Sequence, residues 1–217
     1  IPEAPAAKPP ISIKPFELAA CAPVLANLPA PVADDLPRNM EMYDQGYGCI
    51  LYRTTLPAGP AGKLEAAAIH DFGYVFMDGE RIGITDRRTS AYHLEVPART
   101  KPARLDILVE PMGRVNFGVE VHDRKGIQAP VRFTPKNGET KELTDWSVFK
   151  MPLDNVMLAG LKFASAKPGV LAFWRGKFTV AAPGDTFLDL RTWGKGVVWV
   201  NGHCLGRFWN IGPTQTA

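Results

Sequence analysis

The chain has 217 residues, of which 46% are hydrophobic, and this is enough for one large domain or two modest ones with a buried core. The formal net charge is only +3. No basic run interleaved with aromatic residues occurs, so the composition argues against a nucleic-acid partner. No apolar stretch approaches ~18 residues, so we expect no membrane-spanning helix and no membrane partner.

Cysteine and histidine usage also limits the possible chemistry. The three cysteines, Cys21, Cys49 and Cys204, form an odd set without close spacing, which predicts neither a disulfide framework nor a metal site. The four histidines are scattered, each inside or beside an expected strand. Because metal sites need clustered ligands, we expect no metal and no cofactor.

The expected elements, taken in chain order, are mostly short strands. Residues 1–10 are rich in Pro and Ala, as is typical of a linker or strap. Residues 11–14 (ISIK) alternate and predict a strand, and residues 16–28 predict a short helical turn. From Gly48 onward, short apolar runs bounded by Gly, Pro or Asp follow one another. This pattern, in a chain with 20 glycines and 20 prolines, predicts an all-β fold of sandwich type.

An internal repeat groups these strands into two copies. Residues 75–83 (VFMDGERIG) and 198–206 (VWVNGHCLG) share an apolar run, then Asp-Gly or Asn-Gly, then an apolar residue and Gly. Asp-Gly and Asn-Gly between apolar runs predict hairpin turns, because both turn residues need positive φ. Upstream, residues 52–56 (YRTTL) match residues 174–178 (WRGKF) at nearly the same spacing. Two tandem β-units are the simplest explanation.

The repeat predicts the domain organisation. We expect a linker or strap with a possible strand at residues 1–40, a first sandwich at 41–138 and a second at 139–217, with the boundary at the loop 134–138. The first copy continues through an apolar strand at 105–110, but only eleven residues follow Gly206 in the second. We therefore expect the second sandwich to be truncated and closed by residues from outside 142–217, either 11–14 or a separate chain.

Four stretches resemble the C-terminal, non-catalytic region of glycoside hydrolase family 35 β-galactosidases. They are residues 42–48 with 51–54, residues 105–110 with 113–118 and 125–127, residues 194–202, and residues 205–209 with 211–213. The resemblance covers about residues 37–216 and implies two tandem jelly-roll, galactose-binding-like β-sandwiches. In this family they follow a (β/α)8 barrel that carries two catalytic glutamates and removes terminal β-galactose with retention.

The resemblance implies an accessory region rather than a catalyst. The chain shows no βα alternation, so we expect no barrel, no catalytic residue and no activity from it alone. Asp106 and Glu110 would share one face of a strand roughly 13 Å apart, which is too far for a retaining pair. The implied role is to brace the catalytic barrel of the same enzyme, and possible contact with a β-galactoside follows if the region lines the cleft. The resemblance also implies a periplasmic or extracellular location.

Five residues are candidates for contact with sugar or with the barrel: Arg114, Asn116, Phe117, Trp193 and Trp209. An aromatic plane suits the apolar face of galactose, and the two tryptophans lie next to expected turns, although packing against a neighbouring domain is the alternative. In the family a Tyr or Phe of the 114–118 loop lies near the barrel mouth. Here it is Phe117, which has no hydroxyl, and the alternative for Arg114 and Asn116 is that they fix a turn.

Two other functions stay open at this point. The same fold serves free carbohydrate-binding modules that recognise galactose, and it could also serve as a purely structural interdomain clamp. A concave aromatic site open to solvent would favour the first, and a large apolar face paired with the barrel would favour the second.

Overall fold

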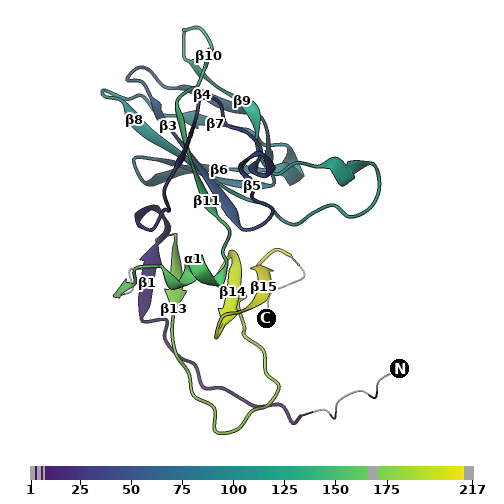
Figure 1. Cartoon of the computed structure of the whole chain (residues 1–217). Helices are drawn as coiled ribbons and strands as arrows, with labels where there is room; N and C mark the ends of the chain where they lie inside the picture. The colour runs from purple at the N-terminus through teal and green to yellow at the C-terminus, as the bar shows by residue number, and fades with distance from the viewer. Residues whose placement is uncertain (1–2, 4–5, 7, 166–170, 213–217) are drawn as a thin grey trace. The chain divides into compact units, whose positions relative to one another are not determined.

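The computed structural model describes residues 3, 6, 8–165 and 171–212, and these fall into two compact units (Figure 1). The central unit spans Pro23–Lys162, and the terminal unit combines Ile1–Ala22 with Phe163–Ala217. Much of the expected linker at 1–10 and the end of the resemblance, residues 213–216, lie outside the described residues.

The chain is nearly all β, as predicted. The strands are β1 (Ala20–Pro23), β2 (Val32–Asp34), β3 (Cys49–Leu56), β4 (Gly62–His70), β5 (Phe72–Met77), β6 (Glu80–Asp86), β7 (His93–Val96), β8 (Ala103–Glu110), β9 (Gly126–Pro135), β10 (Lys141–Glu142), β11 (Trp146–Met151), β12 (Ala164–Ser165), β13 (Ala172–Arg175), β14 (Lys195–Val200) and β15 (His203–Trp209). The helical elements are the short α1 (Asn155–Ala159) and the single 3-10 turns η1 (Val24–Ala26), η2 (Met40–Tyr43), η3 (Arg87–Thr89) and η4 (Val119–His122).

The central unit is a two-sheet sandwich. One sheet has the order β2-β11-β3-β8-β5-β6 and the other the order β10-β9-β4-β7. Apolar side chains of both sheets form one buried cluster, with Ile50, Ile107 and Val75 from the first sheet and Ile69 and Val131 from the second. Because each sheet buries one apolar face against the other, this shared core holds the unit together.

Strand β8 lies at the centre of the larger sheet. It pairs antiparallel with β3 on one side, where Tyr52 faces Ile107, and with β5 on the other, where Val75 faces the same Ile107. Leu105, Ile107 and Val109 point into the core and are at most 1% exposed. The neighbouring β3 and β5 therefore run parallel to each other and are joined only through β8.

The two expected hairpin turns are confirmed. Asp78 and Gly79 join β5 to β6 with φ of 51° and 93°, and Asn201 and Gly202 join β14 to β15 with φ of 49° and 83°. Each hairpin also has a register shift at the equivalent place, between Val75 and Phe76 in one and at the matching step of β14 in the other. A turn and a bulge shared at matching positions support the internal repeat in structural terms.

The described residues of the terminal unit form two smaller sheets, in the orders β12-β1-β13 and β14-β15. Its N-terminal segment contributes β1, in which Cys21 faces Ala164 of β12. Further upstream, the Ile11 N–H donates to the Asp185 carbonyl over 2.8 Å. Residues from the N-terminal segment therefore take part in this unit.

Three details differ from the sequence-based expectations. The structure places the division between units after Lys162 rather than between 138 and 139, because β11 pairs with β3 and buries Trp146 and Val148 in the central core. Residues 11–14 form no strand, and β1 at Ala20–Pro23 supplies the N-terminal pairing instead. The expected helical turn is reduced to η1, which follows directly on β1.

The Asn201–Gly202 turn gives a direct stability test. The substitution Gly202→Val forces a β-branched residue to a φ of +83°, so the free energy of unfolding should fall by about 1–2 kcal/mol. Gly46→Ala is the matched control, because a Cβ added at Gly46 would meet no atom within 4 Å. Tryptophan fluorescence during urea unfolding measures the loss, and an unchanged midpoint for Gly202→Val would show that the turn is not formed.

Candidate functional site

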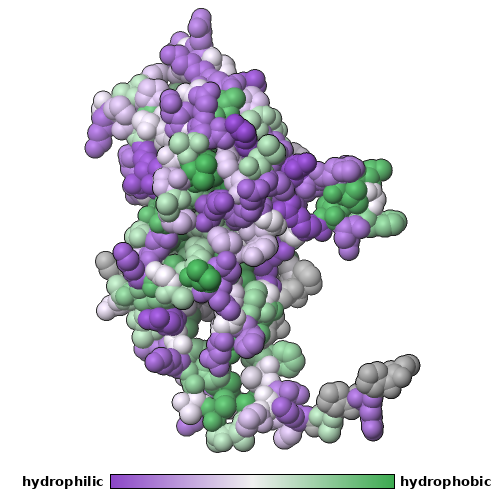
Figure 2. All heavy atoms as spheres, viewed as in Figure 1, coloured by the Kyte–Doolittle hydropathy of each residue, from purple (hydrophilic) through white to green (hydrophobic). Residues whose placement is uncertain are grey.

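The loop 111–125 between β8 and β9 carries the candidate site and extends away from the sandwich of the central unit (Figure 1). Its tip, residues 115–121, is apolar, with Phe117 89% exposed and Val119 91% exposed. Val115 and Val121 are also exposed, and Figure 2 shows a hydrophobic lobe at this place. An exposed apolar cluster of this kind is typical of a surface that binds a partner.

Four charged side chains at the base of the loop form a buried ion cluster: Asp71, Arg87, Asp123 and Lys125. Lys125 Nζ lies 2.8 Å from Asp71 Oδ2 and 2.7 Å from Asp123 Oδ2. Arg87 Nη1 lies 2.9 Å from Asp71 Oδ1 and 2.5 Å from Asp123 Oδ2. Each carboxylate therefore contacts both cations, and the formal charges of the cluster balance.

The electrostatics of the cluster favour its charged form. Burial by itself would raise the pKa of the Asp71 carboxyl, but hydrogen bonds from Lys125, the Met112 N–H and Arg87 outweigh burial and lower that pKa. For Asp123, burial again opposes ionisation, and hydrogen bonds from Arg87 and Lys125 lower the pKa. The hydrogen bond to Asp123 in turn raises the pKa of Arg87 despite partial burial. Asp71, Asp123 and Arg87 therefore stay ionised at neutral pH.

The ion cluster clamps both ends of the loop. At the start of the loop, the Met112 N–H donates to Asp71 Oδ2 over 2.7 Å. At its end, Asp123 and Lys125 are themselves members of the cluster, and His70 Nδ1 lies 2.9 Å from Asp123 Oδ1. Because Asp71 stands between β4 and β5, the clamp ties the loop directly to both sheets of the sandwich.

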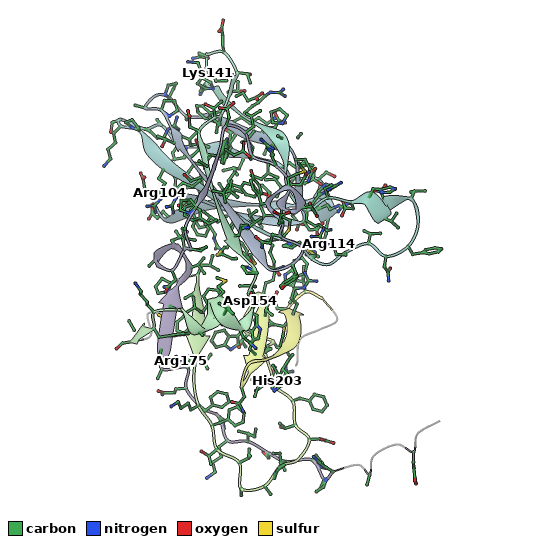
Figure 3. All side chains as sticks on the ribbon, viewed as in Figure 1. Arg104, Arg114, Lys141, Asp154, Arg175 and His203 are labelled. Carbon is green, nitrogen blue, oxygen red and sulfur yellow. The ribbon has the colours of Figure 1, made fainter. Side chains whose placement is uncertain are left out.

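Arg114 adds a second anchor. Its Nε and Nη2 donate to the Gly46 carbonyl over 3.0 and 2.6 Å, and Nη1 forms an ion pair with Glu41. Glu41 also accepts a hydrogen bond from the Lys125 N–H over 2.9 Å. Figure 3 labels Arg114 where the loop leaves the body of the unit. The loop is thus fastened at its base while its tip faces solvent.

Three of the five predicted site residues lie in this loop. Arg114 is the anchor just described, and Asn116 and Phe117 are exposed on the tip. The structure therefore brings together the residues of the 114–118 segment, with the aromatic ring as the most prominent apolar group among them.

The other two predicted residues belong to the terminal unit. Trp193 is 43% exposed and meets Trp174 edge to face, with ring centroids 6.0 Å apart. Trp209 is partly buried, and Lys195 Nζ lies 5.1 Å from the centroid of its ring. Each tryptophan thus combines exposed surface with a packing contact inside its own unit.

Asp106, one of the carboxylates considered from sequence, is fully buried and not exposed to solvent. Its oxygens accept from Arg53 Nε over 2.6 Å and from Arg104 Nε over 2.9 Å. A carboxylate held by two guanidinium groups serves as a structural ion pair inside the sheet.

Among the described residues, no group of three or more His, Cys, Asp or Glu side chains is placed to hold a metal ion. No helix in the described part of the chain is long and apolar enough to cross a membrane.

The buried ion cluster was not foreseen from the sequence. Its members come from four separate positions along the chain, and only the fold brings Asp71 and Asp123 together. A weak signal existed, because Asp71 interrupts two long apolar runs and Lys125 immediately precedes the apolar strand β9. A charge between buried runs suggests a paired ion, but it does not identify the partner.

The cluster predicts a large cost for losing its buried amine. Lys125→Met leaves two buried carboxylates with one cation, so the free energy of unfolding should fall by about 3–5 kcal/mol. Lys63→Met is the matched control, because the Lys63–Glu65 pair is solvent-exposed and should contribute less than ~1 kcal/mol. Urea unfolding followed by circular dichroism compares the two variants, and equal losses would contradict the assigned role of the cluster.

The cluster also predicts a pH dependence. The pKa of Asp71 and of Asp123 is lowered in the folded chain, so their contribution is complete above the unfolded-state value of about 3.9. That contribution is lost as the pH falls through the lowered folded-state values. The stability difference between the parent chain and Lys125→Met, measured by urea unfolding from about pH 7 down to about pH 2, should therefore be largest at neutral pH and shrink once the pH falls below about 4. A difference that stays constant over this range would rule out the cluster as its source.

Comparisons with known proteins place these units among galactosidase domains. Residues 37–153 match the family described as "Beta-galactosidase, first all-beta domain", and residues 171–217 match "Beta-galactosidase, galactose-binding domain". A Beta-galactosidase of Xanthomonas manihotis is 40% identical over 192 residues, which is 88% of this chain and 31% of that protein. The Homo sapiens Beta-galactosidase is 31% identical over 86% of this chain and 30% of its own length. The chain thus spans about 30% of the length of these relatives.

Proposed function

Because the chain belongs to the family of the first all-β domain of β-galactosidases, we propose that it is the non-catalytic accessory region of a retaining β-galactosidase. In this proposal a separate catalytic barrel of the same enzyme hydrolyses terminal β-galactose, and the two units described above brace it. The proposal is supported by the two family matches, which cover most of the chain. The periplasmic or extracellular location stays a prediction from the resemblance.

The single observation that carries the bracing role is the apolar tip on the clamped loop. Phe117 and Val119 expose most of their side-chain surface, which is unfavourable in water unless a partner covers it. The base of the same loop is held by the buried ion cluster. A loop that is already ordered loses little conformational entropy on docking, so apolar contacts at its tip convert efficiently into binding free energy.

The same loop could form part of the wall of the cleft. The ring of Phe117 offers an apolar plane without a hydroxyl, so its contribution would be packing against the barrel or against the C–H face of a galactose ring. Arg114 would act as a positioning residue, because its hydrogen bonds to Gly46 and its ion pair with Glu41 set where the tip points.

The bracing role predicts an effect that appears only when the barrel is present. In the β-galactosidase that carries this region, Val119→Ser should lower kcat/KM by an amount equivalent to about 1–2 kcal/mol of activation free energy, as for a central interface residue. Val156→Ser is the matched control, because Val156 is 83% exposed on α1, outside the loop. In the isolated 217-residue chain both variants should unfold like the parent to within about 0.5 kcal/mol, and neither should cleave a chromogenic β-galactoside.

Two outcomes would contradict the proposal. Equal kcat/KM values for Val119→Ser and Val156→Ser in the whole enzyme would show that the tip contacts nothing there. Turnover that persists in the purified isolated chain after removal of contaminants would show that the region itself is catalytic.

A free galactose-binding module is the second candidate, and one observation favours it. Trp193 is 43% exposed and lies within residues 171–217, the part that matches the galactose-binding domain. Saturable quenching of tryptophan fluorescence by galactose, lost in Trp193→Ala, would support this function. A purely structural clamp would instead leave galactose unbound and make Val119→Ser affect stability without changing kcat/KM at low temperature.

A further inference from the structure

A short turn at residues 44–48, between η2 and β3, displays an exposed aromatic side chain. Tyr47 in this turn is 65% exposed, and it is the one exposed residue among the five tyrosines of the chain, all of which lie in the described part. Met42, at the neighbouring η2, is 55% exposed. A large ring that stays in water in this way is a candidate for contact with a partner.

The backbone of the 44–48 turn is held on both sides of this ring. Gln45 is buried, and its Nε2 donates to the Tyr47 carbonyl over 2.8 Å. Gly48 has a φ of +84°, and a Cβ at this position would collide with the Met151 carbonyl oxygen, so the turn needs glycine here. The turn therefore has a fixed conformation, while the ring that it carries faces solvent.

Arg114 fastens this turn to the loop 111–125. Its Nε and Nη2 donate to the Gly46 carbonyl over 3.0 and 2.6 Å, one residue before Tyr47, and its Nη1 pairs with Glu41 of η2. Figure 3 labels Arg114 where the loop leaves the body of the unit. One guanidinium group thus connects the turn and η2 to the loop whose tip is apolar.

We propose that Tyr47 is a second contact point for the catalytic barrel of the same enzyme, beside the tip of the loop 111–125. This inference deepens the function proposed above and rests on it. The barrel is the occupant because the turn is continuous with that loop through Arg114. The chain also spans only about 30% of the length of its relatives, so the larger part of such a protein is available to cover this face.

The chemistry of the ring suits a protein partner. Tyrosine offers a large amphipathic contact area with few rotatable bonds, so covering it costs little conformational entropy. Within the described part of the chain, the Tyr47 hydroxyl has no hydrogen-bond partner, so it is free to donate to an acceptor on the barrel. Because the turn beneath the ring is already held, docking does not have to order its backbone. Pre-ordered aromatic residues of this kind contribute much of the binding free energy of interfaces.

Nitration by tetranitromethane, read out by peptide mass spectrometry, measures whether the ring is covered. In the isolated 217-residue chain, Tyr47 should react fastest of the five tyrosines, because it is the most exposed. In the complete β-galactosidase its rate of nitration should fall severalfold. The control is Val156→Tyr, at an 83% exposed position on α1, whose new side chain should be nitrated at the same rate in both samples.

Two substitutions separate the ring from its hydroxyl. In the complete enzyme, Tyr47→Ala should shorten the half-life of activity at elevated temperature on the order of tenfold, and Tyr47→Phe, which keeps the ring, should shorten it less. In the isolated chain both variants should unfold at the urea midpoint of the parent, because the side chain is exposed there.

The outcomes separate this inference from the function on which it rests. Equal nitration of Tyr47 in both samples overturns the inference, while the effect of Val119→Ser still tests the proposed function by itself. Nitration that slows only when galactose is added to the enzyme also overturns it, because the ring would then contact sugar and not the barrel. An unchanged half-life for Tyr47→Ala contradicts a contact that contributes to docking. Slowed nitration together with an inert Val119→Ser keeps the Tyr47 contact and removes the tip from the proposed surface.

Discussion

The amine of Lys125 is the constraint on which the candidate site depends. Its side chain is 3% exposed, and an ammonium group taken out of water needs close anionic partners to remain charged. Asp71 and Asp123 provide them, and Arg87 balances the second negative charge. Asp71 lies in the connection between β4 of one sheet and β5 of the other, and Asp123 lies in the loop. The ion pairs of Lys125 with these two carboxylates therefore fix where the loop 111–125 leaves the sandwich.

This arrangement separates a clamped base from an exposed apolar tip. Asp71, Asp123 and Lys125 are buried at the base of the loop, and Phe117 and Val119 are left where a partner can reach them. Buried ion pairs of this kind give a defined geometry more reliably than they give net stability. The proposed bracing role rests on this local chemistry: one end of the loop is fixed by charge, and the other offers apolar surface.

Local signals made much of the fold predictable. The turns at 78–79 and 201–202 follow from Asp-Gly and Asn-Gly between apolar runs, because few other residues adopt positive φ at both positions. The pairing of strands that lie far apart in the sequence could not be predicted in the same way. Strand β11 looks like the start of a new unit in sequence but pairs with β3, far upstream, so the division between units lies later than expected. The strand at 11–14 was expected from alternation alone, whereas β1 is the segment that finds partners.

The candidate site could likewise be predicted only in part. Phe117 and Arg114 were chosen because the 114–118 segment resembles the family loop that lies near the barrel mouth, and the structure places both residues in the loop 111–125. The ion cluster beneath them could not be derived, since no spacing rule connects Asp71 with Asp123 before the sheets are assembled. The repeat, by contrast, was visible in sequence, and its structural value became clear only when the two copies showed different burial of equivalent strands.

Side-chain labelling by hydroxyl radicals tests the central claim most directly, because it measures whether the tip of the loop is covered in the whole enzyme. Phe117 should be labelled rapidly in the isolated 217-residue chain, where it is 89% exposed. In the complete β-galactosidase its labelling should fall severalfold, while Val156 on α1 serves as the reference for a side chain outside the proposed contact. Equal labelling of Phe117 in the two samples would contradict the account, because the tip would then face solvent in the enzyme that it is proposed to brace.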